Sequence, residues 1–127
     1  MALEVELVSP ERILWSGEAD MVVCRTTDGE IAFLTGHAPL LGALGIGIVT
    51  IEEPGGRQTK AAVHSGFVEV SHNKVTLLSD VAELAGDIDV GRAREAKERA
   101  EAALRQQQNV EVEAALRRAN LRLELAS

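Results

Sequence analysis

The chain has 127 residues, a formal net charge of −7 and 46% hydrophobic residues, of which very few are aromatic. This length supports one ordinary core, or a small core with an appendage, and the hydrophobic content excludes general disorder. An acidic chain is a poor candidate for direct nucleic-acid binding, which needs a basic surface. The single cysteine suits a reducing compartment, and no signal peptide or membrane span is visible. We expect a soluble cytosolic protein.

The composition changes at Gly86. Residues 1–85 contain five Lys/Arg and twelve Asp/Glu, whereas residues 86–127 contain eight of each, so the net charge comes entirely from the first part. After Gly86 the chain has one further glycine, no proline and no aromatic residue. Two structural units, 1–85 and 86–127, are the simplest interpretation.

The first unit has the pattern of short strands. Leu3, Val5 and Leu7 alternate with two glutamates, as in a half-buried strand. Further strands are predicted at 21–24, 31–34, 46–51, 60–64, 67–70 and 75–79, with turns at 28–29, 54–56 and 72–73. Many short strands without intervening helices predict an antiparallel β sandwich or barrel.

The second unit has the pattern of two helices. Asp87 and Asp89 are good helix starters, and alanines recur at helical steps from Ala93 to Ala103. A polar break at 106–109 separates them from a second apolar stripe, Val112 to Leu123. The prediction is an α+β protein in which an antiparallel two-helix hairpin follows the sandwich. An alanine seam buries little area, so we expect weak attachment to the sandwich; a permanently docked hairpin is an equal alternative.

No catalytic constellation is visible. The three histidines, His37, His64 and His72, lack the short spacing of a metal site. Ser65-Gly66 lacks the Gly-x-Ser-x-Gly pattern of a nucleophile elbow, and the glycines between 42 and 47 are not followed by Lys-Ser/Thr. An esterase or metal enzyme is therefore the weakest of the functional classes considered.

Three motifs in the first unit point to a family. They are Gly29-Glu30-Ile31, Gly36-His37-Ala38-Pro39-Leu40-Leu41, and Ser65-Gly66-Phe67-Val68-Glu69-Val70, the last with one glycine fewer than the family pattern. With the helical hairpin behind them, the whole chain resembles the epsilon subunit of bacterial F-type ATP synthase. The resemblance implies a non-catalytic central-stalk subunit whose sandwich binds the gamma subunit and the membrane-embedded c-ring.

The resemblance also implies where the protein acts. Coupling of proton-driven rotation to ATP synthesis would place it at the cytoplasmic face of the bacterial plasma membrane, attached to the membrane only through the complex. When the family's motif positions are transferred to this sequence, the resemblance implies that Glu30 and His37 lie on or beside the surface that faces gamma and the c-ring. A purely structural role for His37 is the alternative.

In this family the hairpin is a regulator. Folded down it permits ATP hydrolysis; extended along gamma, its basic residues meet the catalytic alpha/beta head and block rotation. The hairpin here offers Arg92, Arg94, Lys97, Arg99, Arg105, Arg117, Arg118 and Arg122. The alternative is a solvated face in which these residues pair with the eight acidic ones.

The run Ile88-Asp89-Val90-Gly91-Arg92-Ala93 resembles the motif through which some bacterial epsilon subunits bind ATP. The resemblance implies ATP as a regulatory ligand, with no cofactor required. The implied site residues are Glu83, Ile88, Asp89, Arg92, Ala93, Arg99, Arg118 and Arg122. Aligning the last two requires about one helical turn to be missing near Gln106–Glu113.

Two other interpretations of these residues stay open. Asp89 could cap the helix while Arg92 packs on the sandwich. The chain could also be a free-standing nucleotide-binding sensor, with no place in a larger assembly.

Overall fold

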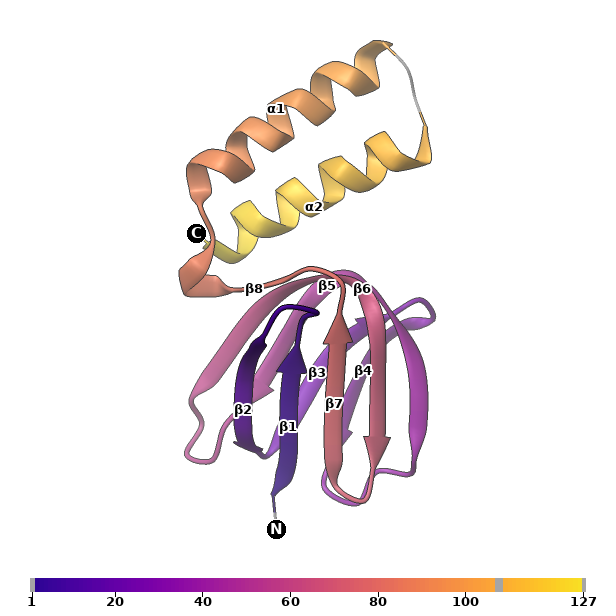
Figure 1. The fold of residues 1–127 in the computed structure, drawn as a ribbon, viewed down its shortest axis with the longest axis vertical. Coiled ribbons are helices and arrows are strands. Elements are labelled where there is room, and N and C mark those ends of the chain that lie inside the picture. The colour runs from indigo at the N-terminus through magenta and orange to yellow at the C-terminus, as the bar shows by residue number, and fades with distance from the viewer. Residues whose placement is uncertain (1, 107–108, 127) are drawn as a thin grey trace.

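The computed structural model describes residues 2–106 and 109–126, so Gln107 and Gln108 of the predicted polar break lie outside the described residues. A β-sheet domain is followed by two helices (Figure 1). The strands are β1 (Leu3–Val8), β2 (Ile13–Ala19), β3 (Met21–Thr26), β4 (Gly29–Leu34), β5 (Leu40–Glu52), β6 (Gln58–Ser71), β7 (Lys74–Ser79) and β8 (Ala82–Leu84). A 3₁₀ turn, η1 (Ala85–Asp87), leads to α1 (Val90–Gln106) and α2 (Val110–Ala126).

The strands form one sheet that rolls around a single core. Their order is β2-β1-β7-β6-β5-β3-β4, with β8 added beside β6. Inward side chains from β1, β3, β4, β5, β6 and β7 form one buried cluster that includes Phe33, Leu7 and Leu77. Strands far apart in the sheet order can share a core only if the sheet folds back on itself. The predicted sandwich is confirmed, although β1 pairs with β7 in parallel rather than antiparallel.

Two of the predicted strands form one continuous strand in the structure. The segments 60–64 and 67–70 belong to β6, which bends at Ser65 (φ 70°) and Gly66 (φ 129°) without ending. Its partner β5 begins at Leu40, well before the predicted start at 46, and includes the glycine-rich stretch. A glycine is needed there because a Cβ on Gly47 would lie 2.7 Å from the Cβ of Arg25.

Two short or exposed strands were missed. β2 is an edge strand whose residues show little alternation of burial, and β8 has only three residues. Neither offers the period-two pattern on which a strand prediction rests.

The hairpin forms as predicted, and each helix begins at a side-chain cap. Asp89 Oδ1 accepts a hydrogen bond from the Arg92 amide at 3.1 Å, and Asn109 Oδ1 accepts one from the Val112 amide at 2.8 Å. Both satisfy amides that have no partner in the first turn of a helix. The buried residues of the two helices are all alanines, Ala93, Ala100, Ala114 and Ala119.

The hairpin rests on the sheet through α2, which contacts β5 and β6 (Figure 1). The covered residues are two cross-strand pairs on one face of the sheet, Ile46 with His64 and Ile48 with Ala62. We call these four residues the helix-facing strip. Ala62 also pairs with Glu83 of β8, so the Glu83 side chain emerges on the same face.

The bend in β6 gives a stability prediction. A Cβ on Gly66 would lie 1.9 Å from the Leu78 carbonyl oxygen and 2.8 Å from the Ser79 Cα. Gly66→Ala should therefore lower the free energy of unfolding by at least about 3 kcal/mol, measured by urea denaturation. Gly55→Ala is the control, because Gly55 (φ 93°) has nothing within 4 Å of a Cβ and should lose only about 1 kcal/mol. Equal losses in the two variants would contradict this account of the bend.

Candidate functional site

Residues from three elements meet where the sheet joins the hairpin. A hollow of about 400 Å³ lies between β8, α1 and α2, a size in the range of small-ligand sites. It is lined by Val81, Glu83, Asp89, Arg92, Ala93, Ala96, Arg99 and Arg122. The structure thus brings together all the predicted nucleotide-site residues except Ile88 and Arg118. We call it the joint hollow.

An ion pair crosses the joint hollow from sheet to hairpin. Arg122 Nε donates to Glu83 Oε1 at 2.6 Å, although the two residues are 39 apart in the sequence. Both side chains keep partial solvent exposure, 23% for Arg122 and 30% for Glu83. Docking of α2 therefore fixes the position of one arginine of the predicted site.

Asp89 acts as a helix cap in this structure. Its Oδ1 accepts from the Arg92 amide, and its backbone oxygen accepts from the Ala93 amide at 3.0 Å. The capping alternative for Asp89 is therefore observed, while Arg92 itself is exposed and lines the joint hollow. Capping also fixes the carboxylate of Asp89 at the edge of that hollow.

Arg118 lies in a neighbouring groove. This groove of about 300 Å³ runs between α1 and α2 and shares Ala96, Arg99 and Arg122 with the joint hollow. Arg118 Nη2 donates to Glu111 Oε1 at 2.8 Å there. Ile88 is half-buried directly after η1 and does not line the joint hollow.

The joint hollow has an excess of positive charge. Arg92, Arg99 and Arg122 face two carboxylates, of which one is already paired and the other caps a helix. Guanidinium groups bind phosphate and carboxylate oxygens strongly, and the small Ala93 and Ala96 leave room between them. The arrangement suits an anionic ligand of moderate size.

Sequence reasoning missed the contribution of His64, which lies in the helix-facing strip under α2. The residue is 5% exposed, and neither ring nitrogen has a hydrogen-bond partner among the residues that the structure describes. Burial, with help from the nearby Arg122, lowers the pKa of His64 from 6.5 to about 4. Only the alternation of buried residues along β6 could have placed it on the covered face.

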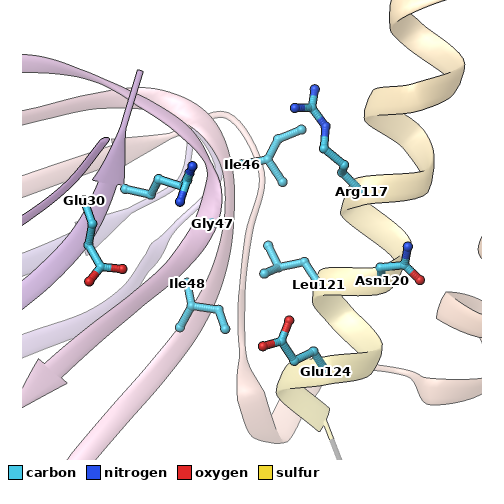
Figure 2. A pocket seen from close by; sticks show the side chains of 9 residues that line it. Glu30, Ile46, Gly47, Ile48, Arg117, Asn120, Leu121 and Glu124 are labelled. Atoms are coloured by element: carbon cyan, nitrogen blue, oxygen red, sulfur yellow. The ribbon is translucent and has the colours of Figure 1, made fainter. Parts of the chain in front are cut away.

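Glu30 and His37 lie towards opposite ends of β4. Glu30 belongs to a second hollow, of about 460 Å³, between the sheet and α2, where Leu121 and Arg117 reach towards β5 (Figure 2). His37 follows the opposite end of β4, beyond the roughly 13 Å of strand that runs from Glu30 to Leu34. Its ring packs edge-on against Phe33, with centroids 4.9 Å apart, and Nδ1 lies 2.6 Å from the Ala38 oxygen. Such contacts fit the structural alternative for His37.

Residues 2–106 and 109–126 contain neither a metal-ligand cluster nor a membrane-spanning helix. No group of three or more His, Cys, Asp and Glu side chains there is placed to hold a metal ion. No described helix has the length and apolar character to cross a membrane.

Family models match both parts of the chain. Residues 2–85 match the beta-sandwich domain of the ATP synthase delta/epsilon chain, and residues 87–127 match its long alpha-helix domain. Similar curated proteins are named ATP synthase epsilon chain. One from Streptomyces griseus subsp. griseus is 49% identical over 121 residues, covering 95% of this chain and 92% of the relative. One from Halalkalibacterium halodurans is 44% identical, covering 98% and 96%.

Solved structures show the same fold. A chain of the mitochondrial ATP synthase of Euglena gracilis, in a structure described as OSCP/F1/c-ring, superposes with a TM-score of 0.85 at 24% identity and covers 98% of this chain and 81% of its own. A chain from the central stalk/c-ring structure of the Tetrahymena thermophila enzyme gives a TM-score of 0.65 at 14% identity, covering 100% and 98%.

Proposed function

This chain belongs to the ATP synthase delta/epsilon family and is an epsilon chain, and from that premise we propose a function in two parts. As a central-stalk subunit it couples proton-driven rotation to ATP synthesis. Through its helical hairpin it also restrains ATP hydrolysis, with ATP as the ligand that keeps the hairpin docked. The protein would lie at the cytoplasmic face of the bacterial plasma membrane, held there only by the complex.

The observation that supports a mobile hairpin is the weakness of its contact with the sheet. No helix residue belongs to the described core cluster, and the fully buried residues of α1 and α2 are alanines. Burying an alanine contributes far less than burying a leucine. The ion pair between Glu83 and Arg122 adds on the order of 1 kcal/mol for partly exposed groups. The sandwich therefore has a complete core without the hairpin.

A ligand in the joint hollow would have enough free energy to control this contact. At 100 times its dissociation constant, a ligand stabilises the state that binds it by about 2.7 kcal/mol. Arg92 and Arg99 come from α1, Arg122 from α2 and Glu83 from the sheet, so bound ATP would touch every part that separates on release. The docked state would then dominate when ATP is plentiful.

An exposed apolar row supports a stalk partner on the outer face of the sandwich. Successive cross-strand pairs join Ile13 to Val8, Val8 to Leu78, Leu78 to Phe67 and Phe67 to Ala43. Three of these side chains are more than half exposed: Ile13 (59%), Phe67 (58%) and Leu78 (51%). A continuous exposed apolar surface is typical of a protein interface. We assign this row to the gamma subunit.

The loop at 36–39 and the strand start after it are assigned to the c-ring. Leu41 is 71% exposed and Leu34 is 56% exposed, on either side of this loop. A free-standing nucleotide sensor would need neither of these apolar surfaces. Co-purification of the chain with the gamma subunit separates the two possibilities.

The partner surface can be tested with one substitution. Phe67→Glu places a charge in the middle of the apolar row and should weaken binding to the gamma subunit at least about tenfold, measured by biolayer interferometry. Val110→Glu is the matched control, because Val110 is 77% exposed at the start of α2, far from that row. Equal affinity of the two variants would exclude the row as the interface.

If the hairpin restrains ATP hydrolysis, its removal should change the rate of hydrolysis. A chain ending at Gly86 keeps every strand and the whole core cluster, so it should still fold and still join the complex. Catalytic complexes reconstituted with it should hydrolyse ATP faster than those with the intact chain at low ATP concentration. Equal rates would remove the inhibitory role and leave coupling intact.

Nucleotide sensing predicts that the isolated chain binds ATP, as measured by isothermal titration calorimetry. Arg92→Ala should weaken binding roughly tenfold or more, since it removes a charge-assisted contact. Arg94→Ala is the control, since this exposed arginine of α1 does not line the joint hollow. Asp89→Asn separates the two roles of Asp89, because asparagine still caps a helix but has no charge. No heat at millimolar ATP would exclude ATP as the ligand.

A further inference from the structure

His64 is the polar member of the helix-facing strip, and its burial needs an explanation. Its amide donates to the Val81 oxygen at 2.9 Å, so the backbone is satisfied. The ring is not: both nitrogens are buried, and no described residue bonds to either. Leaving a buried polar group without a partner costs free energy that an apolar side chain at the same position would not cost.

The charges around the ring are mainly basic. They are Arg118 and Arg122 on α2 and Glu83 on β8, while Arg92 and Arg99 of α1 line the joint hollow together with Arg122. The residue opposite on β5 is the uncharged Ile46. On the other side of the strand, Asp80 accepts a hydrogen bond from Ser65 Oγ at 2.9 Å. Glu83, the carboxylate that acts on the ring, is already paired with Arg122.

We propose that His64 makes docking of the hairpin depend on pH, so that a proton on its ring drives α2 off the sheet. The proposal rests on the hairpin release proposed above and adds a second signal to it. A docked imidazolium would be a buried cation beside two arginines, and none of the residues described in the structure bonds to either of its ring nitrogens. Once α2 leaves, the same ring lies on an open sheet face, where water can solvate the charge.

The direction of the effect follows from the pKa of His64. Its usual value is 6.5, and in the docked molecule burial and Arg122 lower it to about 4. Well above pH 6.5 the ring is neutral in both states, and pH has no effect through it. As the pH falls from 6.5 towards 4, the released state takes up a proton that the docked state does not, so docking weakens. Below about 4 both states are protonated and the effect stops.

The test measures hairpin release in the full chain by energy transfer between two fluorophores. Glu69→Cys on the outer face of β6 and Glu113→Cys on α2 are exposed labelling sites, whereas the native Cys24 is fully buried and its thiol pKa is raised to about 11. Between pH 7.5 and pH 5.5, the ratio of released to docked molecules should rise about tenfold. This window lies above the range in which ordinary carboxylates titrate.

Matched variants assign the response to one ring. His64→Leu and His64→Gln should both abolish the pH response, the first without a polar group and the second with one that does not titrate. His72→Leu, at an exposed histidine in the β6–β7 turn, should leave it unchanged. Circular dichroism at both pH values checks that each variant is folded. A response that persists in both His64 variants would overturn the proposal.

One more variant distinguishes this proposal from the mobility on which it rests. The pair Glu83→Gln/Arg122→Gln removes the ion pair and should release the hairpin even at pH 7.5. If this variant releases the hairpin while the wild type does not respond to pH, His64 is not a pH-dependent element and hairpin mobility stands. If neither releases it, the mobile hairpin itself is wrong.

Discussion

The contact between α2 and the sheet is the constraint on which the rest of the structure depends. It joins a sandwich with its own complete core to a hairpin whose buried residues are all alanines. Leu121, which reaches towards β5, is only half-buried, and full burial of several leucines at this contact would outweigh a small ligand or a single proton. Because no large apolar side chain of α2 is fully buried, the Glu83–Arg122 pair, a ligand in the joint hollow and the protonation of His64 can each shift the balance between docked and released hairpin. A weak interface is thus what makes several independent controls effective.

The bend in β6 separates two surfaces of the sandwich, one under α2 and one that carries the exposed apolar row. On one side of Ser65 and Gly66, the outward residues Ala62 and His64 lie under α2. On the other side, Phe67 is exposed in the apolar row. A straight strand would keep one alternation of faces along its length, whereas the extra bend reorients the strand between the two surfaces. The hairpin and an outer partner can therefore use the same strand without competing for it.

Short-range sequence patterns predicted those features of the structure that depend only on neighbouring residues. The alternation from Leu3 to Leu7, the turns at 54–56 and 72–73, and the Asp89 cap and alanine steps of the hairpin all act over a few residues, and each appears in the structure; Asp87, the other predicted helix starter, lies in η1 instead. The parallel pairing of β1 with β7 and the bend that unites two predicted strands into β6 depend on distant partners, so no local pattern indicates them. Six of the eight predicted nucleotide-site residues line one hollow, and five of them come from the consecutive segment that runs from β8 into α1. The partnership of Arg122 with Glu83 and the burial of His64 arise only from tertiary packing.

The pairing of β1 with β7 also sets the order in which the chain can fold. Leu7 lies beside Leu77 in this ladder, so β1, which can pair with β2 at once, finds its second neighbour only after almost all of the sandwich exists. Contacts between residues so far apart require a large loop to close, which is slow relative to hairpin formation. The β5–β6 and β6–β7 hairpins can form before β1 pairs with β7. The free edge of β7 then offers the hydrogen-bonding groups to which β1 pairs. Because β7 precedes β8 and the helices in the chain, β1 can pair with β7 before the helical hairpin docks on the sheet.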